Sequence, residues 1–356
     1  MYLFPLYFTL WPGWLLVTLV SLITVAAIAF IGPKLVANNP KSLVQLRVSM
    51  ILTALAVVGL STMLLWFTIS MLGYSGSLLL IAILVAIMGF VQWLIAPYII
   101  NMLYNVREAG SELNWLREEV YRIAEASGLR GKPKLVIAEV DAPNAFAYGN
   151  PFTGYYVAVT RGMLRLMSRE ELVAVIGHEI GHLRHKDVHI LLALGLLPSI
   201  VYYIGRMLID LGIIGGYYNN RREERGGTFT YLVVGIVLVA ASIILHFLLR
   251  HLSRLREYYA DAHSAIVVGS ARPLQRALAK LHLAYVNDSR LVEELNRNSA
   301  ASMLFFVNYF YDIDNVIEEL KKSKTNPLAE LFSTHPPIPK RLRFLDELEK
   351  NLLRAV

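Results

Sequence analysis

The sequence predicts an α-helical integral membrane protein that also carries a mainly helical α+β domain with a small β-sheet. Hydrophobic residues make up 56% of the 356 positions and charged residues only 17%, whereas soluble domains hold about 25% charged residues. The mean hydropathy of +0.49 agrees with this class. The composition excludes disordered, collagen-like and coiled-coil chains. The absence of cysteine excludes disulfides and thiolate metal ligands, so a metal must be held by His, Asp or Glu.

Five apolar stretches are long enough to cross a bilayer, which takes about 20 residues. They are roughly residues 14–31, 50–72, 78–103, a stretch that starts near Ile190, and 231–249. They divide the chain into a membrane region with three spans, a first soluble part, a transmembrane hairpin with two spans, and a second soluble part. These parts cover residues 1–104, 105–189, 190–249 and 250–356. We expect the two soluble parts to form one globular domain that the hairpin interrupts.

The first soluble part alternates between helix and strand patterns. Its hydrophobic spacing predicts an amphipathic helix at 112–127, and β-rich runs between turn residues predict strands at 134–140, 145–148 and 155–160. Ser168 and Glu171 then have the spacing of a capping box, which predicts the start of a helix that runs through the 180s.

That helix carries the sequence His178-Glu179-Ile180-Gly181-His182. Two imidazoles at i and i+4 lie on one helical face, about 6 Å apart, so both can bind one zinc ion. Glu179 is rotated by one residue, which places its carboxylate beside the metal, where it can accept a proton from water. The alternative is an amphipathic helix whose histidines lie at a membrane interface.

A catalytic zinc needs one more protein ligand, and a carboxylate after the fifth span is the natural candidate. Glu257 and Asp261 are also at i and i+4. Glu257 can bind the metal, while Asp261 can accept the second N–H of a zinc-binding histidine and so fix its tautomer. The alternative for Glu257 is a surface pair with Arg254 at i,i+3.

These motifs together resemble the HtpX-type membrane zinc metallopeptidases, which are related to the CAAX prenyl proteases. The resemblance covers about residues 133–343 and rests on separate motifs in the expected order. These are His178–His182, Asp187 five residues later, Glu257 with Asp261, the segment Asn144–Gly149, and His335-Pro336-Pro337 followed by Arg341.

The resemblance implies a zincin-type metallopeptidase domain of the gluzincin group. In it His178, His182 and Glu257 bind Zn²⁺, and Glu179 is the general base. His335 is implied to approach the active site and to stabilise the oxyanion, whereas Arg341 is expected to be structural.

The segment Asn144, Ala145 and Phe146 is implied to lie beside the active site. There an extended substrate peptide can add to the edge of a sheet. The alternative for Asn144 is an asparagine that only satisfies a turn.

The expected function is a membrane-embedded, zinc-dependent endopeptidase. The resemblance implies peptide and protein substrates, and a role in the stress response through quality control of misfolded or damaged membrane proteins. One alternative is a processing protease for a defined peptide or lipidated substrate. Another is a non-proteolytic membrane scaffold or transporter with a structural zinc site, against which the general base Glu179 argues.

Charge predicts the orientation in the membrane, since Lys and Arg beside spans concentrate on the cytoplasmic side. The first loop between spans and the span ends of the soluble domain are rich in Lys and Arg, and three preceding spans place both on one side. The basic residues thus favour an anionic membrane surface over nucleic acid as their partner. We expect a multi-pass protein of the cell membrane with an external N-terminus and a catalytic domain that faces the cytoplasm.

Overall fold

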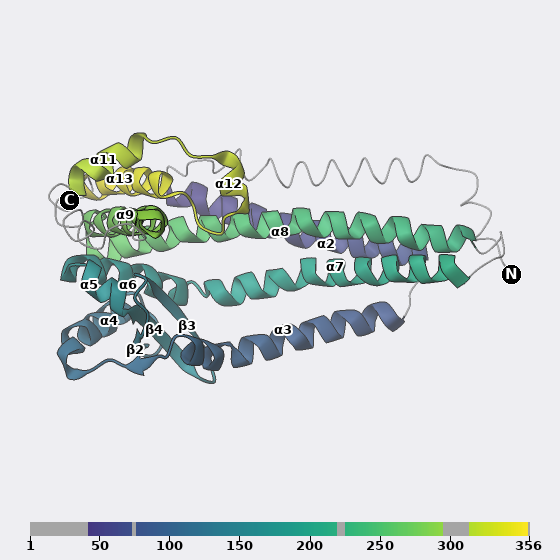
Figure 1. The fold of residues 1–356 in the computed structure, drawn as a ribbon, viewed down its shortest axis with the longest axis horizontal. Helices are drawn as coiled ribbons and strands as arrows, with labels where there is room; N and C mark the ends of the chain where they lie inside the picture. The colour runs from purple at the N-terminus through teal and green to yellow at the C-terminus, as the bar shows by residue number, and fades with distance from the viewer. Residues whose placement is uncertain (1–41, 73–75, 219–224, 295–312, 355–356) are drawn as a thin grey trace. The chain divides into compact units, whose positions relative to one another are not determined.

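The structure is a computed structural model that describes residues 42–72, 76–218, 225–294 and 313–354. Its longest elements are four helices, seen as the extended coils in Figure 1: α2 (Leu43–Leu72), α3 (Gly76–Leu103), α7 (Asp187–Tyr218) and α8 (Arg225–Val268). Each contains a segment long and apolar enough to cross a membrane, namely Leu43–Leu72, Leu78–Leu103, Asp187–Gly215 and Thr228–Val268. These helices occupy four of the five stretches expected from the sequence. The first stretch, 14–31, lies outside the described residues.

Helix α8 continues well beyond the stretch expected to cross the membrane. It runs without a break past Leu249 to Val268, because no Gly or Pro follows Leu249 before Glu257 that could end it. Glu257 and Asp261 therefore lie on the same continuous helix as the last expected span.

The chain forms two compact units. Of the described residues, one unit holds Arg47–Ile87 and Ala193–Leu252, and the other holds the remainder, including Met88–Leu192 and the chain from Ser253 onward. The first unit is all helical. Its α7 and α8 pack closely at Gly205, where an added Cβ would lie 2.9 Å from the Leu238 Cβ.

The second unit contains a four-stranded sheet. The strands are β1 (Arg107–Glu108), β2 (Lys134–Ala138), β3 (Ala145–Asn150) and β4 (Gly154–Thr160), in the order β1-β2-β4-β3. β2 and β4 are parallel, and the outer pairs are antiparallel. The sequence predicts β2, β3 and β4, but a strand of two residues such as β1 has no detectable pattern. β3 is an edge strand.

Helices cover this sheet and build the core of the second unit. They are η1 (Ser111–Leu113), α4 (Asn114–Ala126), α5 (Arg161–Leu166), α6 (Arg169–Arg184), α9 (Arg272–Glu294), α11 (Ile313–Lys322), α12 (Pro327–Phe332) and α13 (Ile338–Arg354). The amphipathic face of α4 buries Leu116, Val120 and Ile123 in the same core as Ile176 and Ile180 of α6. The confirmed fold class is thus a helical membrane protein with a mainly helical domain and a small mixed sheet.

Candidate active site

Helix α6 presents the two histidines, and its start is fixed by local chemistry. The Ser168 side chain accepts the Glu171 N–H, and the Glu171 side chain accepts the Ser168 N–H, which is the expected capping box. The helix then stays regular through His178 and His182. Both imidazoles therefore project from one face, as their spacing predicts.

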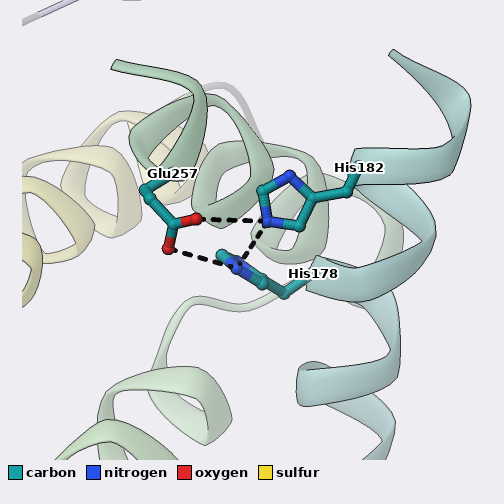
Figure 2. Close-up of side chains that lie close together, drawn as sticks. All are labelled: His178, His182 and Glu257. Carbon is teal, nitrogen blue, oxygen red and sulfur yellow. Dashed lines mark hydrogen bonds and ion pairs between the residues drawn. The ribbon is translucent and has the colours of Figure 1, made fainter. Parts of the chain in front are cut away.

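The side chains of His178, His182 and Glu257 converge on one point (Figure 2). The two Nε2 atoms are 3.1 Å apart. The Glu257 carboxylate from α8 faces both, with Oε1 3.4 Å from His182 Nε2 and Oε2 3.7 Å from His178 Nε2. One ligand atom from each residue lies within 4.8 Å of the others. Two imidazole nitrogens and a carboxylate oxygen are a donor set that suits zinc.

The Nδ1 atom of each imidazole lies within hydrogen-bonding distance of a buried carboxylate. His178 Nδ1 lies 2.9 Å from Asp261 Oδ1, and His182 Nδ1 lies 2.7 Å from Asp187 Oδ2. A carboxylate at Nδ1 keeps the proton there and leaves Nε2 free to bind a metal. Burial opposes the charged form of His182, but its hydrogen bonds to Asp187 and Glu257 raise its pKa to about 10.

Two buried arginines hold the carboxylates in turn. Arg341 Nε donates to Asp261 Oδ2 at 2.8 Å, and another nitrogen of its guanidinium lies 3.3 Å from Glu257 Oε2. Arg256 donates to Asp187 and, at 2.6 Å, to the carbonyl of His185. Every charged group of this network is therefore paired, as buried charges must be.

Two glycines on α6 allow α8 to come close enough to deliver Glu257. An added Cβ at Gly177 would lie 3.3 Å from the Ser264 Cα, and one at Gly181 would lie 3.3 Å from the Ala260 Cα. These distances are tighter than ordinary van der Waals contact. Gly181, between the two histidines, therefore helps α8 to approach closely enough for the Glu257 side chain to reach them.

Glu179 is half-buried beside the convergence point. Its Oε2 accepts a 3.0 Å hydrogen bond from the N–H of Ala147 on β3. Burial raises the pKa of the Glu179 carboxyl, and the neighbouring His178 and His182 partly oppose the shift. A carboxylate with a raised pKa next to a metal site has the properties of a general base.

The outer edge of β3 lies beside α6. The register in which β3 pairs with β4 decides which backbone groups of β3 point to this outer edge. The Ala147 N–H points outward to Glu179, while the Asn144 carbonyl accepts the Thr160 N–H on the β4 side. In an antiparallel pair these directions alternate, so Ala145 and Ala147 face outward and Phe146 faces β4. The Phe146 ring packs 4.9 Å from Tyr104, away from the α6 side. Of the three residues expected to bind substrate, only Ala145 turns its backbone groups to this edge. The Ala147 carbonyl also faces this edge, whereas the Ala147 N–H is bonded to Glu179.

His335 lies at the entrance of the cluster. Its Nε2 is 3.6 Å from Glu257 Oε1, and its side chain is 65% exposed. Thr334 Oγ1 lies 3.0 Å from its Nδ1. The structure therefore places this imidazole next to the Glu257 carboxylate and open to solvent.

The sequence did not identify the roles of Asp187 and Arg256. The resemblance includes Asp187 without giving it a partner, and its donor proves to be His182. Its spacing of five from His182 was the one available signal. Arg256 stands next to Glu257 in the sequence, but its partner Asp187 is 69 residues away, so no local pattern could reveal the pair.

Comparison with known proteins agrees with this geometry. The profile of peptidase family M48 matches residues 111–349. A protease HtpX homolog of Aeropyrum pernix is 47% identical over 315 residues, which cover 85% of this chain and 98% of the relative. The protease HtpX homolog 2 of Saccharolobus solfataricus is 37% identical over 325 residues, covering 86% and 98%. A crystal structure of S. mikatae Ste24p matches with 18% identity and a TM-score of 0.48, covering 85% of this chain and 66% of that one.

Four apolar helices together with these protease relatives define the class of the protein, a membrane metalloprotease. The match to the family profile extends over most of the chain and includes α6, both histidines and Glu257. The chain belongs to peptidase family M48. The resemblance inferred from the sequence motifs is thereby confirmed.

Proposed function

We propose that the protein is a zinc-dependent endopeptidase whose metal is held by His178, His182 and Glu257. One observation carries the proposal: both Nε2 atoms face the Glu257 carboxylate while both Nδ1 atoms are bonded to buried carboxylates. Zinc supplies, when bound, a Lewis acid that polarises a peptide carbonyl and lowers the pKa of water. The Asp261 and Asp187 carboxylates keep the two imidazoles in the required tautomer and orientation.

Glu179 is the general base in this proposal. Its carboxylate accepts a proton from the attacking water and later delivers that proton to the amine that leaves. The Ala147 N–H holds one carboxylate oxygen at 3.0 Å, which fixes the direction of the other. The exposed imidazole of His335 is the group at the site entrance that can donate a hydrogen bond to the oxyanion.

The outward edge of β3 is the proposed binding surface for the substrate backbone. An extended peptide that pairs with the backbone of Ala145 and with the carbonyl of Ala147 would run along α6, past Glu179. Main-chain pairing is independent of side-chain identity, so it suits a protease that cleaves many unfolded chains. We therefore propose quality control of misfolded or damaged membrane proteins as the physiological role.

The substitution Glu179→Gln tests the catalytic proposal. The purified, zinc-loaded variant should keep stoichiometric zinc and its fold but lose cleavage of an unfolded protein substrate, because the ligands remain and the base is gone. Glu170→Gln is the matched control, since Glu170 is exposed on the same helix. Cleavage by Glu179→Gln at the rate of the control would refute the role of Glu179. A preference for one lipidated or C-terminally tagged peptide over unfolded membrane proteins would favour a processing protease instead.

The proposed orientation places the catalytic domain in the cytoplasm, on the basis of the Lys and Arg residues beside the spans. The chain has no cysteine, so single cysteines can be probed in intact cells with a thiol reagent that does not cross membranes. Ser75→Cys, between the second and third expected spans, should be labelled. Ala126→Cys, on the exposed face of α4, should be labelled only after lysis. The reverse pattern would place the site outside the cell.

A further inference from the structure

The hairpin formed by β3 and β4 has an unusual composition for the surface of a soluble domain. No charged residue occurs between Asp141 and Arg161. At its tip, residues 150–154, Pro151 is exposed and Phe152 is 73% exposed. A single exposed aromatic residue is ordinary, but the Phe152 ring contacts Trp93, which contacts the exposed Phe90 of α3, and a contiguous exposed apolar patch marks an interaction surface.

The tip of the hairpin is bound to the membrane helix α3 by hydrogen bonds and an aromatic contact. Pro97 has no N–H, so the carbonyl of Trp93, four residues earlier, lacks its helical donor. The Asn150 Nδ2 lies 3.4 Å from that carbonyl and 3.3 Å from the carbonyl of Leu94. The Phe152 ring meets the Trp93 ring edge-on, with centroids 6.1 Å apart. The hairpin tip is therefore held at the level of Trp93.

Trp93 lies well inside the apolar segment of α3. That segment, Leu78–Leu103, has 26 residues, and a bilayer core takes about 20. If the bilayer core ends at Pro97, the twentieth residue counted from Leu78, Trp93 is about 6 Å inside the bilayer core along the helix axis. If the bilayer core ends at Leu103, Trp93 is about 15 Å inside it. On either count, a side chain beside Trp93 is at the depth of the lipid acyl chains.

The N–H groups of Asn150, Phe152 and Thr153 in the tip are satisfied within the hairpin, as a lipid environment requires. The Asn150 Oδ1 accepts the N–H groups of Phe152 and Thr153, each at 3.0 Å. The Asn150 N–H donates to Thr153 Oγ1 at 3.3 Å, and Pro151 has no N–H to satisfy. The Tyr156 hydroxyl donates to the Thr153 carbonyl at 3.2 Å.

We propose that the tip of this hairpin, residues 150–154, inserts into the membrane beside α3, with Phe152 among the lipid acyl chains. Lipid fits this surface because the apolar surface of α3 continues into it without a charge, and because the tip exposes no unpaired N–H at residues 150, 152 and 153. In combination with the proposed peptide binding at Ala145 and Ala147, a substrate segment could pass from the bilayer directly onto β3.

Single-cysteine variants labelled with bimane test the insertion directly, and the measurement needs no catalytic activity. Phe152→Cys and Pro151→Cys, both at exposed positions, are reconstituted as the full chain in phosphatidylcholine vesicles at a low ratio of protein to lipid. Leu84→Cys, at a half-exposed position of α3, is the control within lipid, and Ala126→Cys on α4 is the control in water. The emission is compared in ordinary lipid and in lipid with brominated acyl chains, which quench on contact.

Bimane at 152 and 151 should lose as much emission in brominated lipid as bimane at 84, while bimane at 126 should lose none. Emission at both tip positions that matches position 126 would overturn the proposal, because the tip would then lie in water. Blue-shifted emission that the brominated lipid does not quench would also overturn it, since a protein surface would then cover the tip. Failure of the proposed peptidase activity would leave this result unaffected.

Discussion

Replacement of Asp187 by asparagine tests whether the carboxylate behind His182 prepares the metal site. Asp187 is 3% exposed and accepts hydrogen bonds from two donors, the His182 Nδ1–H and the Arg256 guanidinium. An asparagine side chain is the same size but has only one acceptor oxygen, so one of the two donors must face an NH₂ group. In either orientation the variant loses one of the contacts that fix the imidazole.

The expected loss in zinc affinity is about 10- to 100-fold, the usual effect of removing a partner of a metal-binding histidine. This corresponds to about 1.4–2.7 kcal/mol of binding free energy. Because Arg256 is buried and loses its charged partner, we also expect the free energy of unfolding of the zinc-free protein to fall by about 1–3 kcal/mol.

The assay is a competition titration of zinc against a chromophoric chelator, on the wild type, Asp187→Asn and Asp141→Asn. Asp141 is the matched control, because its side chain is 88% exposed and pairs with Arg165 on the surface. Asp141→Asn should bind zinc like the wild type. If folded Asp187→Asn also bound zinc with wild-type affinity, the carboxylate would have no part in preparing the site.

Three further substitutions test the ligand set and its packing. Glu257→Ala should abolish stoichiometric zinc binding, whereas Asp261→Ala should weaken zinc binding by about 10- to 100-fold. Metal analysis and the same titration measure both effects. Equal zinc content in Glu257→Ala and the wild type would exclude Glu257 as a ligand. Gly181→Ala should lower the zinc affinity, because the added Cβ would push α8 away. It should also lower the free energy of unfolding, measured by thermal unfolding, by about 1–3 kcal/mol. An unchanged zinc affinity and an unchanged stability would show that Gly181 is not needed for the close approach of α8.

Helix α6 was predictable because its signals are local. The capping box at Ser168 and Glu171 and the i,i+4 spacing of His178 and His182 each lie within one or two helical turns, where spacing alone decides which side chains share a face. The i,i+4 relation of Glu257 and Asp261 is local too, but it indicates a metal ligand and its partner only in combination with the His178–His182 motif. For these residues the sequence pattern and the geometry agree.

The partners of these residues could not be predicted, because they depend on contacts between distant segments. Arg341 bonds Asp261 across 80 residues, and Arg256 bonds Asp187 across 69. The backbone direction of Ala147 follows from the pairing register of β3 with β4, and a shift of one residue would exchange Ala147 with Phe146 at the free edge. Composition carries no information about that register.

The charge balance of the site explains why a cation suits it. The buried network around the two histidines contains three carboxylates, Glu257, Asp261 and Asp187, and two guanidinium groups, Arg256 and Arg341. These side chains sum to one negative charge, to which the carboxylate of Glu179 beside the histidines can only add, in a buried region where an uncompensated charge is costly. A proton on a histidine can compensate it, which agrees with the raised pKa of His182. A divalent cation compensates it as well and also binds both Nε2 atoms, which a proton on one ring cannot do. The network therefore favours a metal ion at this position through its net charge as well as through its ligand geometry.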